Sequence, residues 1–167
     1  MSLMKTTRTM AAALALAGLS ACGNDDVTSP VPPPPGPGVA GTYTAGNMWL
    51  VQFERLSDST RGSYTCAGSL TISQAPSSSA LSGFAVVGSP CPPVSFNLTG
   101  TIQADGTLTL TGDGPRPVSC ESQTATYSGQ FSNGSLLSAR ASVTLNCSGE
   151  VQGRHRFDYI VTGRRNN

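Results

Sequence analysis

The sequence predicts an all-β domain built as an antiparallel up-and-down barrel of about eight strands. Apolar residues alternate with polar ones, Asp-Gly and Asn-Gly turns separate these runs, and no stretch has the 3.6-residue period of a helix. Only 11% of the 167 residues are charged and 38% are hydrophobic, a balance that excludes charge-driven disorder and a coiled coil. A two-sheet β-sandwich is the alternative architecture.

In each predicted strand, apolar residues occupy every second position. The pattern is clearest in residues 137–147, where Leu, Ala, Val and Cys alternate with Ser, Arg, Thr and Asn. In the last run, the residues expected to face the same side are Val151, His155, Phe157, Tyr159 and Val161. The predicted strands span about 42–53, 64–74, 80–88, 94–103, 107–112, 122–131, 135–147 and 150–162. Closing such strands into a barrel leaves no exposed edge, which favours the barrel over the sandwich.

Turn residues and glycines support this division of the chain. Asp105-Gly106 and Asn133-Gly134 supply the positive φ angles that tight hairpins need. Gly100 and Gly129 lie inside predicted strands, where a glycine indicates a sharp bend or a bulge. A closing sheet requires such bends.

The N-terminal residues 1–21 have the pattern of an export signal. Lys5 and Arg8 precede an apolar run from Met10 to Leu19, which is too short for a membrane span of about 20 residues. The run ends in Leu19-Ser20-Ala21-Cys22, which closely resembles the lipobox of bacterial lipoproteins, Leu-(Ala/Ser)-(Gly/Ala)-Cys.

The lipobox resemblance implies a lipid anchor on Cys22. The thiol would receive a diacylglyceryl group, the signal would be cut before Cys22, and fatty-acyl chains such as palmitate would hold the protein to a membrane, since two or three chains anchor stably. Gly23 follows the cysteine, which favours the outer membrane, facing the periplasm or the cell surface. The alternative is an ordinary secretory signal.

A Pro/Gly-rich tether, residues 22–38, separates this anchor from the predicted β domain, residues 39–167. Its proline run favours an extended polyproline II conformation and a spacer role. Removing the signal leaves eight arginines against nine acidic residues, a net charge of −1. Such a nearly neutral protein gives no reason to expect a nucleic-acid partner.

Four cysteines of the domain, Cys66, Cys91, Cys120 and Cys147, indicate two disulfides in an oxidising compartment. Three pairings are possible. Sequential pairing is favoured because it closes two loops of similar size. A zinc site is the competing interpretation, but metal-binding cysteines usually come in close pairs, and these do not.

The sequence contains no motif of a catalytic, cofactor or metal site. Asp105 and Asp113 fall in predicted turns, while Glu54 and Asp58 flank the first strand, so turn and capping duty is expected of all four. We therefore predict a non-enzymatic protein with no cofactor and no metal. The leading hypothesis is a lipid-anchored envelope domain with a binding or structural role toward an envelope protein.

The sequence leaves two alternatives open. Gly41-Thr42-Tyr43 resembles the Gly-x-Trp opening of lipocalin-like (calycin) barrels, with Tyr43 in place of Trp; the resemblance implies that an arginine near the end of the last strand, Arg164, packs on it. On this alternative the barrel carries a small apolar ligand. The residues expected to line its pocket are Trp49, His155, Phe157 and Tyr159. An envelope enzyme or inhibitor is the other alternative.

Overall fold

The computed structural model describes residues 37–166. The predicted signal peptide, Cys22 and the tether up to residue 36 lie outside the described residues. Among the described residues, no helix has the length and apolar character needed to cross a membrane.

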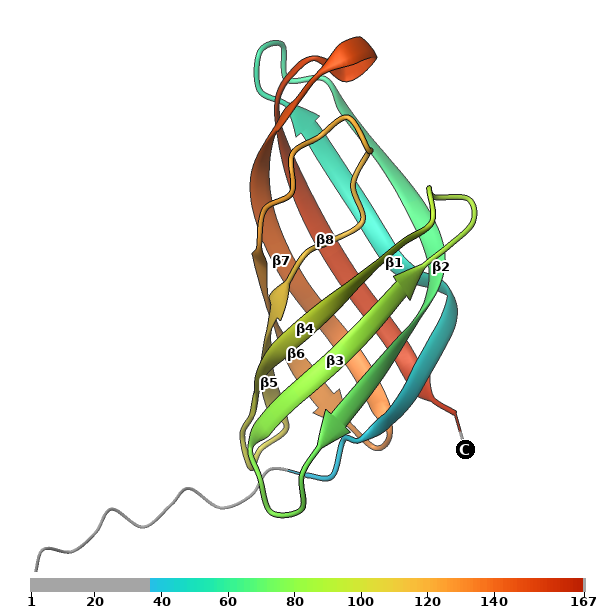
Figure 1. The fold of residues 1–167 in the computed structure, drawn as a ribbon, viewed down its shortest axis with the longest axis vertical. Coiled ribbons are helices and arrows are strands. Elements are labelled where there is room, and N and C mark those ends of the chain that lie inside the picture. The colour runs from blue at the N-terminus through green and yellow to red at the C-terminus, as the bar shows by residue number, and fades with distance from the viewer. Residues whose placement is uncertain (1–36, 167) are drawn as a thin grey trace, which may run out of the picture. The chain divides into compact units, whose positions relative to one another are not determined.

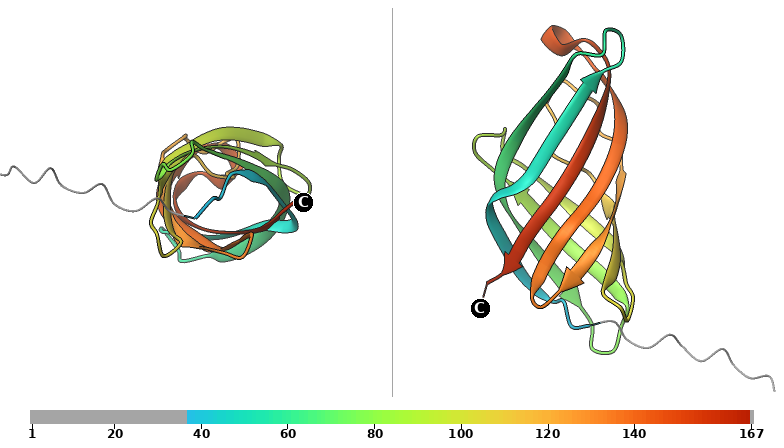
Figure 2. Two further views of the ribbon diagram at one scale, coloured as in Figure 1. Left: turned by 90° about the horizontal axis from the view of Figure 1, so that it is seen from below. Right: turned by 180° about the vertical axis from the view of Figure 1, so that it is seen from behind.

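The described residues form a closed barrel of eight antiparallel strands in sequence order, which confirms the predicted architecture (Figures 1 and 2). The strands are β1 (Gly41–Arg55), β2 (Arg61–Gln74), β3 (Ala80–Val87), β4 (Val94–Ile102), β5 (Thr107–Gly112), β6 (Ala125–Ser132), β7 (Ser135–Cys147) and β8 (Gly153–Arg165). Each strand pairs with its neighbours in sequence, and β1 pairs with β8 to close the barrel. No sheet edge is therefore left open along the ring.

Several strand boundaries differ from the predicted ones by up to three residues. β1 extends to Arg55 instead of 53, and β2 begins at Arg61 instead of 64. The strand predicted from residue 122 begins at Ala125, because residues 122–124 belong to a long loop after β5. The last strand, predicted from residue 150, begins at Gly153, because Gly149–Val151 form a short 3-10 turn. It continues to Arg165, where it pairs with Tyr43 of β1.

The apolar parity of the strands points into the barrel, as predicted, but one bulge in β7 interrupts it. From Ala139 to Cys147 the odd-numbered residues are buried. The register of β7 against β8 then shifts between Leu136 and Ala139, and Ser138 adopts a positive φ of 49°. Leu136, an even-numbered residue, is buried, so the buried face changes parity across the bulge.

Glycines inside the strands allow neighbouring strands to approach closely. The predicted bulge is confirmed at Gly129, which lies at a register shift, whereas β4 pairs regularly at Gly100. A Cβ atom on Gly100 would overlap the carbonyl oxygen of Thr109 in β5. One on Gly129 would lie 2.5 Å from the Cα of Ala139, beside a register shift between Ser128 and Gln130. Side chains at these positions would force the strands apart.

The bottom end of the barrel, in the view of Figure 1, holds the short turns 75–79, 103–106 and 133–134 and the start of the described chain. The Val39 side chain is fully buried there, and its backbone N–H donates to Gln74 Oε1 at 2.9 Å. The Tyr43 hydroxyl donates to the Val39 carbonyl oxygen. These contacts close this end of the barrel.

An arginine of β8 packs over the start of β1, but it is Arg165 rather than Arg164. Its Nη1 donates to the carbonyl oxygens of Gly38 and Ala40, both at 3.3 Å. A Cβ on Gly41 would lie 2.6 Å from Arg165 Cδ, so the arginine stem covers this glycine. The expectation for Arg164 was wrong by one residue, because β8 runs further than predicted and its side chains alternate in direction.

The opposite end of the barrel carries the connections 56–60, 88–93, 113–124 and 148–152, of which 113–124 is the longest (Figure 1). Cys66 is bonded to Cys91, and Cys120 to Cys147, which confirms the sequential pairing. Each bridge fastens a loop from the short-stranded side, β3 to β6, to a long strand, β2 or β7. Cys66 lies inside β2 and Cys147 is the last residue of β7, so the disulfides hold the two loops against these strands.

Candidate functional site

The loop of residues 113–124 is the longest connection in the barrel and is held by an ordered set of polar contacts. The Asp113 carboxylate accepts hydrogen bonds from the Gly114 N–H at 2.9 Å and the Ser122 hydroxyl at 2.6 Å. Arg116 lies 3.3 Å from the same carboxylate and donates to the Cys120 carbonyl oxygen at 2.9 Å. Because these bonds lie within the loop, they fix its shape.

The same loop pairs with the top of β7 beside the Cys120–Cys147 bridge. The Glu121 N–H donates to the Asn146 carbonyl oxygen at 2.9 Å. The Glu121 carboxylate accepts from the backbone and side-chain nitrogens of Asn146 at 2.9 and 2.8 Å. The sequence indicated the bridge but not this pairing, since a run without apolar alternation gives no strand signal.

Beneath this loop lies a small apolar void of about 60 Å³. It is lined by Phe53, Tyr64, Pro117, Cys120, Cys147, Val151, His155 and Phe157. His155 is almost fully buried, as its parity predicted, and its Nδ1 lies 3.3 Å from the Gly153 carbonyl oxygen. No Asp or Glu lines this void, so the arrangement that would make His155 part of an acid–base pair is not found here.

The four residues predicted to line a ligand pocket lie inside the barrel but do not surround a common cavity. Trp49 packs edge-on against Phe96 and Tyr127, with ring centroids 5.6 and 5.9 Å apart. Tyr159 stacks between Tyr127 and Phe157 at 6.1 and 6.3 Å. Only His155 and Phe157 of the four line the small void. Its volume is well below the roughly 300 Å³ of a typical ligand pocket.

The acidic residues expected to serve turns and caps make local polar contacts. The Asp105 carboxylate accepts from the Thr107 N–H at 2.8 Å, and Asp58 accepts from the Thr60 N–H at 3.0 Å. These hydrogen bonds hold the pKa of both carboxyls below the ordinary value. Glu54 bridges Arg61 and Arg156, each at 3.0 Å. The predicted turn and capping role is confirmed for Asp58, Asp105 and Asp113. It was wrong for Glu54, because β1 extends past this residue and its carboxylate pairs with arginines of neighbouring strands.

Burial perturbs the titration of the tyrosines inside the barrel. It raises the pKa of Tyr64 to about 12. Burial also raises the pKa of Tyr127 and Tyr159, and the mutual repulsion of tyrosinates and the Asp113 charge add to the effect. Burial likewise raises the pKa of Tyr43, although the Arg165 charge partly offsets it. All four tyrosines of the chain are therefore harder to ionise than in water.

Raising the pH above about 10 is expected to destabilise the barrel, because the unfolded chain ionises its tyrosines near pH 10 and the folded one does not. The stability contributed by the neutral tyrosines is complete below pH 10 and falls as the pH rises toward and through 12. For each buried tyrosine, such as Tyr127 or Tyr159, the free energy of unfolding falls by about 1.4 kcal/mol per pH unit between about pH 10 and 12.

An alkaline titration that records circular dichroism and tyrosinate absorbance together tests this expectation. Both signals should change in one transition, because ionisation follows unfolding. Tyrosinate absorbance from most tyrosines near pH 10, with the dichroism of the folded barrel retained, would contradict it.

The outer surface is divided by charge. The Asp, Glu, Arg and His residues of the strands all lie on β1, β7, β8 and the first residue of β2. No charged residue or histidine occurs in residues 62–104 or 122–139. Among the described residues, no group of three His, Cys, Asp or Glu side chains is placed to hold a metal ion.

The comparisons with known proteins add no relative. No protein-family model, no curated protein and no solved structure matches this chain significantly. The fold itself is an all-β, disulfide-bonded, closed eight-stranded barrel.

Proposed function

We propose that this chain is a lipid-anchored cell-envelope protein whose β-barrel has a non-catalytic binding or structural role. The observation that carries the proposal is Leu19-Ser20-Ala21-Cys22 at the end of a short apolar run preceded by Lys5 and Arg8. A charged start, an apolar run too short to span a membrane, and a cysteine at its end occur together in lipoprotein signals.

The disulfides are consistent with this proposal. They pair the four cysteines of the barrel with one another, so neither bridge involves Cys22. Disulfides form and persist in oxidising compartments such as the bacterial periplasm. An exported chain with two internal bridges and a fifth cysteine at the lipobox position fits an envelope lipoprotein of the outer membrane.

The two ends of the barrel suit different roles on this proposal. The described chain enters at the bottom end, where Val39 is buried beside Gln74. The two longest loops, 88–93 and 113–124, lie at the opposite end, and each carries one cysteine of a disulfide. Loops 88–93 and 113–124 are therefore presented away from the point at which the tether joins the barrel.

A binding role is favoured over a carrier role, because aromatic side chains fill the interior. Trp49, Tyr127 and Tyr159 are each about 1% exposed and pack on one another or on neighbouring rings. A partner would then contact the outside of the barrel or its loops. Crosslinking in intact cells followed by capture of this chain should recover one defined envelope component.

Replacing Cys22 with serine is expected to abolish membrane attachment, because serine cannot carry the thioether-linked lipid. The wild-type chain should fractionate with membranes, and mass spectrometry of its mature N-terminus should find a lipidated Cys22. Ser20→Ala is the matched control, since alanine also fits the lipobox and retention should persist. A wild-type chain that is unmodified at Cys22 and soluble would overturn the proposal.

A further inference from the structure

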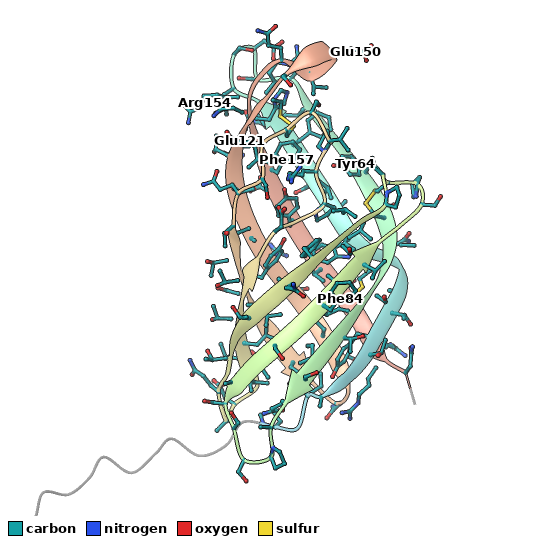
Figure 3. All side chains as sticks on the ribbon, viewed as in Figure 1. Tyr64, Phe84, Glu121, Glu150, Arg154 and Phe157 are labelled. Atoms are coloured by element: carbon teal, nitrogen blue, oxygen red, sulfur yellow. A yellow bond between two sulfur atoms is a disulfide. The ribbon has the colours of Figure 1, made fainter. Side chains whose placement is uncertain are left out.

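The outer face of strands β2, β3 and β4 carries an uncharged array of side chains around one exposed aromatic ring. Phe84 is 46% exposed and Val86 41% exposed, both on β3. Figure 3 shows the labelled Phe84 on this face of the barrel. The outward residues of the three strands at this level are Ser69, Thr71 and Ser73, then Ser82, Phe84 and Val86, then Ser95, Asn97 and Thr99.

The strand register places polar groups on both sides of the phenylalanine. Phe84 lies opposite Thr71 of β2 and opposite Asn97 of β4. Val86 lies between Ser69 and Ser95 in the same way. Since neighbouring strands are about 4.8 Å apart, the two polar rows flank the ring at a mutual separation of about 10 Å.

These polar groups keep hydrogen-bonding capacity for a partner, although the Thr71 hydroxyl lies 3.1 Å from the Thr42 hydroxyl and shares one hydrogen bond with it. Within residues 37–166 the Asn97 side chain makes no hydrogen bond, so its amide offers both donors and an acceptor. A serine or threonine hydroxyl can also donate and accept. The array therefore combines an apolar ring with groups that can exchange hydrogen bonds in either direction.

The chemistry of the face selects its partner. No charge occurs from residue 62 to residue 104, so the face offers nothing to an anionic polymer, a basic peptide or a charged membrane surface. A protein partner usually requires about 800 Å² on each side with several large apolar anchors, and this face exposes only Phe84 and Val86. A neutral sugar polymer needs a ring to stack on and hydroxyl partners at its edges.

We propose that the outer face of β2, β3 and β4 binds a neutral β-linked glycan strand, with one sugar ring lying flat on Phe84. Hydroxyl groups at the edges of that sugar would exchange hydrogen bonds with Asn97 on one side and Thr71 on the other. The proposal rests on the binding role proposed above, but not on the lipid anchor.

Cosedimentation with insoluble chitin and cellulose tests the proposal with the full chain, purified from whichever cell fraction contains it. The wild-type protein should be depleted from solution by at least one of the two β-linked polymers. Phe84→Ser should weaken this binding roughly tenfold, because the stacking surface is lost. Asn97→Ala should weaken it roughly threefold through loss of the amide hydrogen bonds.

Val118→Ser is the matched control, because Val118 is 88% exposed on the loop 113–124 and outside this face. Its binding should equal that of the wild type, and thermal unfolding should show that all variants fold. Absence of binding to both polymers, or binding unchanged in Phe84→Ser, would overturn the proposal. Concentration-dependent dimerisation lost in Phe84→Ser would also overturn it, since a second copy would then occupy the face.

The lipid anchor is tested separately by fractionation of Cys22→Ser. A chain that is not lipidated but binds glycan would contradict the anchor alone. A lipidated chain that binds neither polymer would contradict the glycan site alone.

Discussion

Truncating Trp49 to alanine is expected to lower the free energy of unfolding by about 3–5 kcal/mol, the range for removal of a fully buried large aromatic side chain. Trp49 lies in the middle of the barrel, 1% exposed, between the rings of Phe96 and Tyr127. Those neighbours come from β4 and β6, which the barrel holds in place, so they cannot collapse into the space. Denaturant unfolding followed by circular dichroism measures the loss.

Trp49→Phe is the matched control and should cost much less, about 1–2 kcal/mol. The indole Nε1 has no hydrogen-bond partner, so phenylalanine loses some volume but no hydrogen bond. A Cβ on Gly68 would also lie 3.0 Å from that nitrogen, which indicates tight packing on this side. Equal stability of Trp49→Ala and the wild type would mean that the interior is looser than described.

Removing the Cys120–Cys147 bridge by substituting both cysteines with serine is expected to destabilise the barrel by about 3.5 kcal/mol. The bridge joins residues separated by 27 positions, and that estimate follows from the loop-closure entropy regained by the unfolded chain. The loop 113–124 would also lose its covalent attachment to β7. Hydrogen exchange should become faster at the amides of Glu121 and Ser148, which donate to the carbonyl oxygens of Asn146 and Ser119 across this junction.

The second disulfide provides the comparison. Cys66 and Cys91 are separated by 25 positions, so the corresponding double serine variant should lose nearly the same free energy of unfolding. It should leave the exchange at Glu121 and Ser148 unchanged, because its effect on the folded state is confined to the loop 88–93. Faster exchange at those amides in both variants would show that the top end opens as one unit.

The regular part of this fold follows from local patterns. Alternation in residues 139–147 predicts a strand with one buried face, and Asp105-Gly106 predicts a hairpin turn. The structure confirms both. These patterns were readable because the side-chain period of a strand and the positive φ of a turn are properties of neighbouring residues.

The irregular features of the fold were harder to predict from the sequence. The bulge at Ser138 shifts the parity of β7 by one residue, and nothing in the local sequence distinguishes it from continued alternation. The network of Asp113, Arg116 and Ser122 joins residues of a loop without apolar period. A Pro-Arg-Pro sequence between such polar residues marks a loop, but it does not specify which side chains meet.

By itself the sequence determined the strands, the lipobox pattern at Cys22 and the choice of a sequential disulfide pairing. Only the tertiary structure decided that the barrel is filled, that Arg165 rather than Arg164 covers the start of β1, and that Phe84 faces outward among uncharged neighbours. The reason is physical. Whether an interior is hollow depends on how side chains from distant strands interdigitate, and that packing is a property of the closed ring rather than of any single strand.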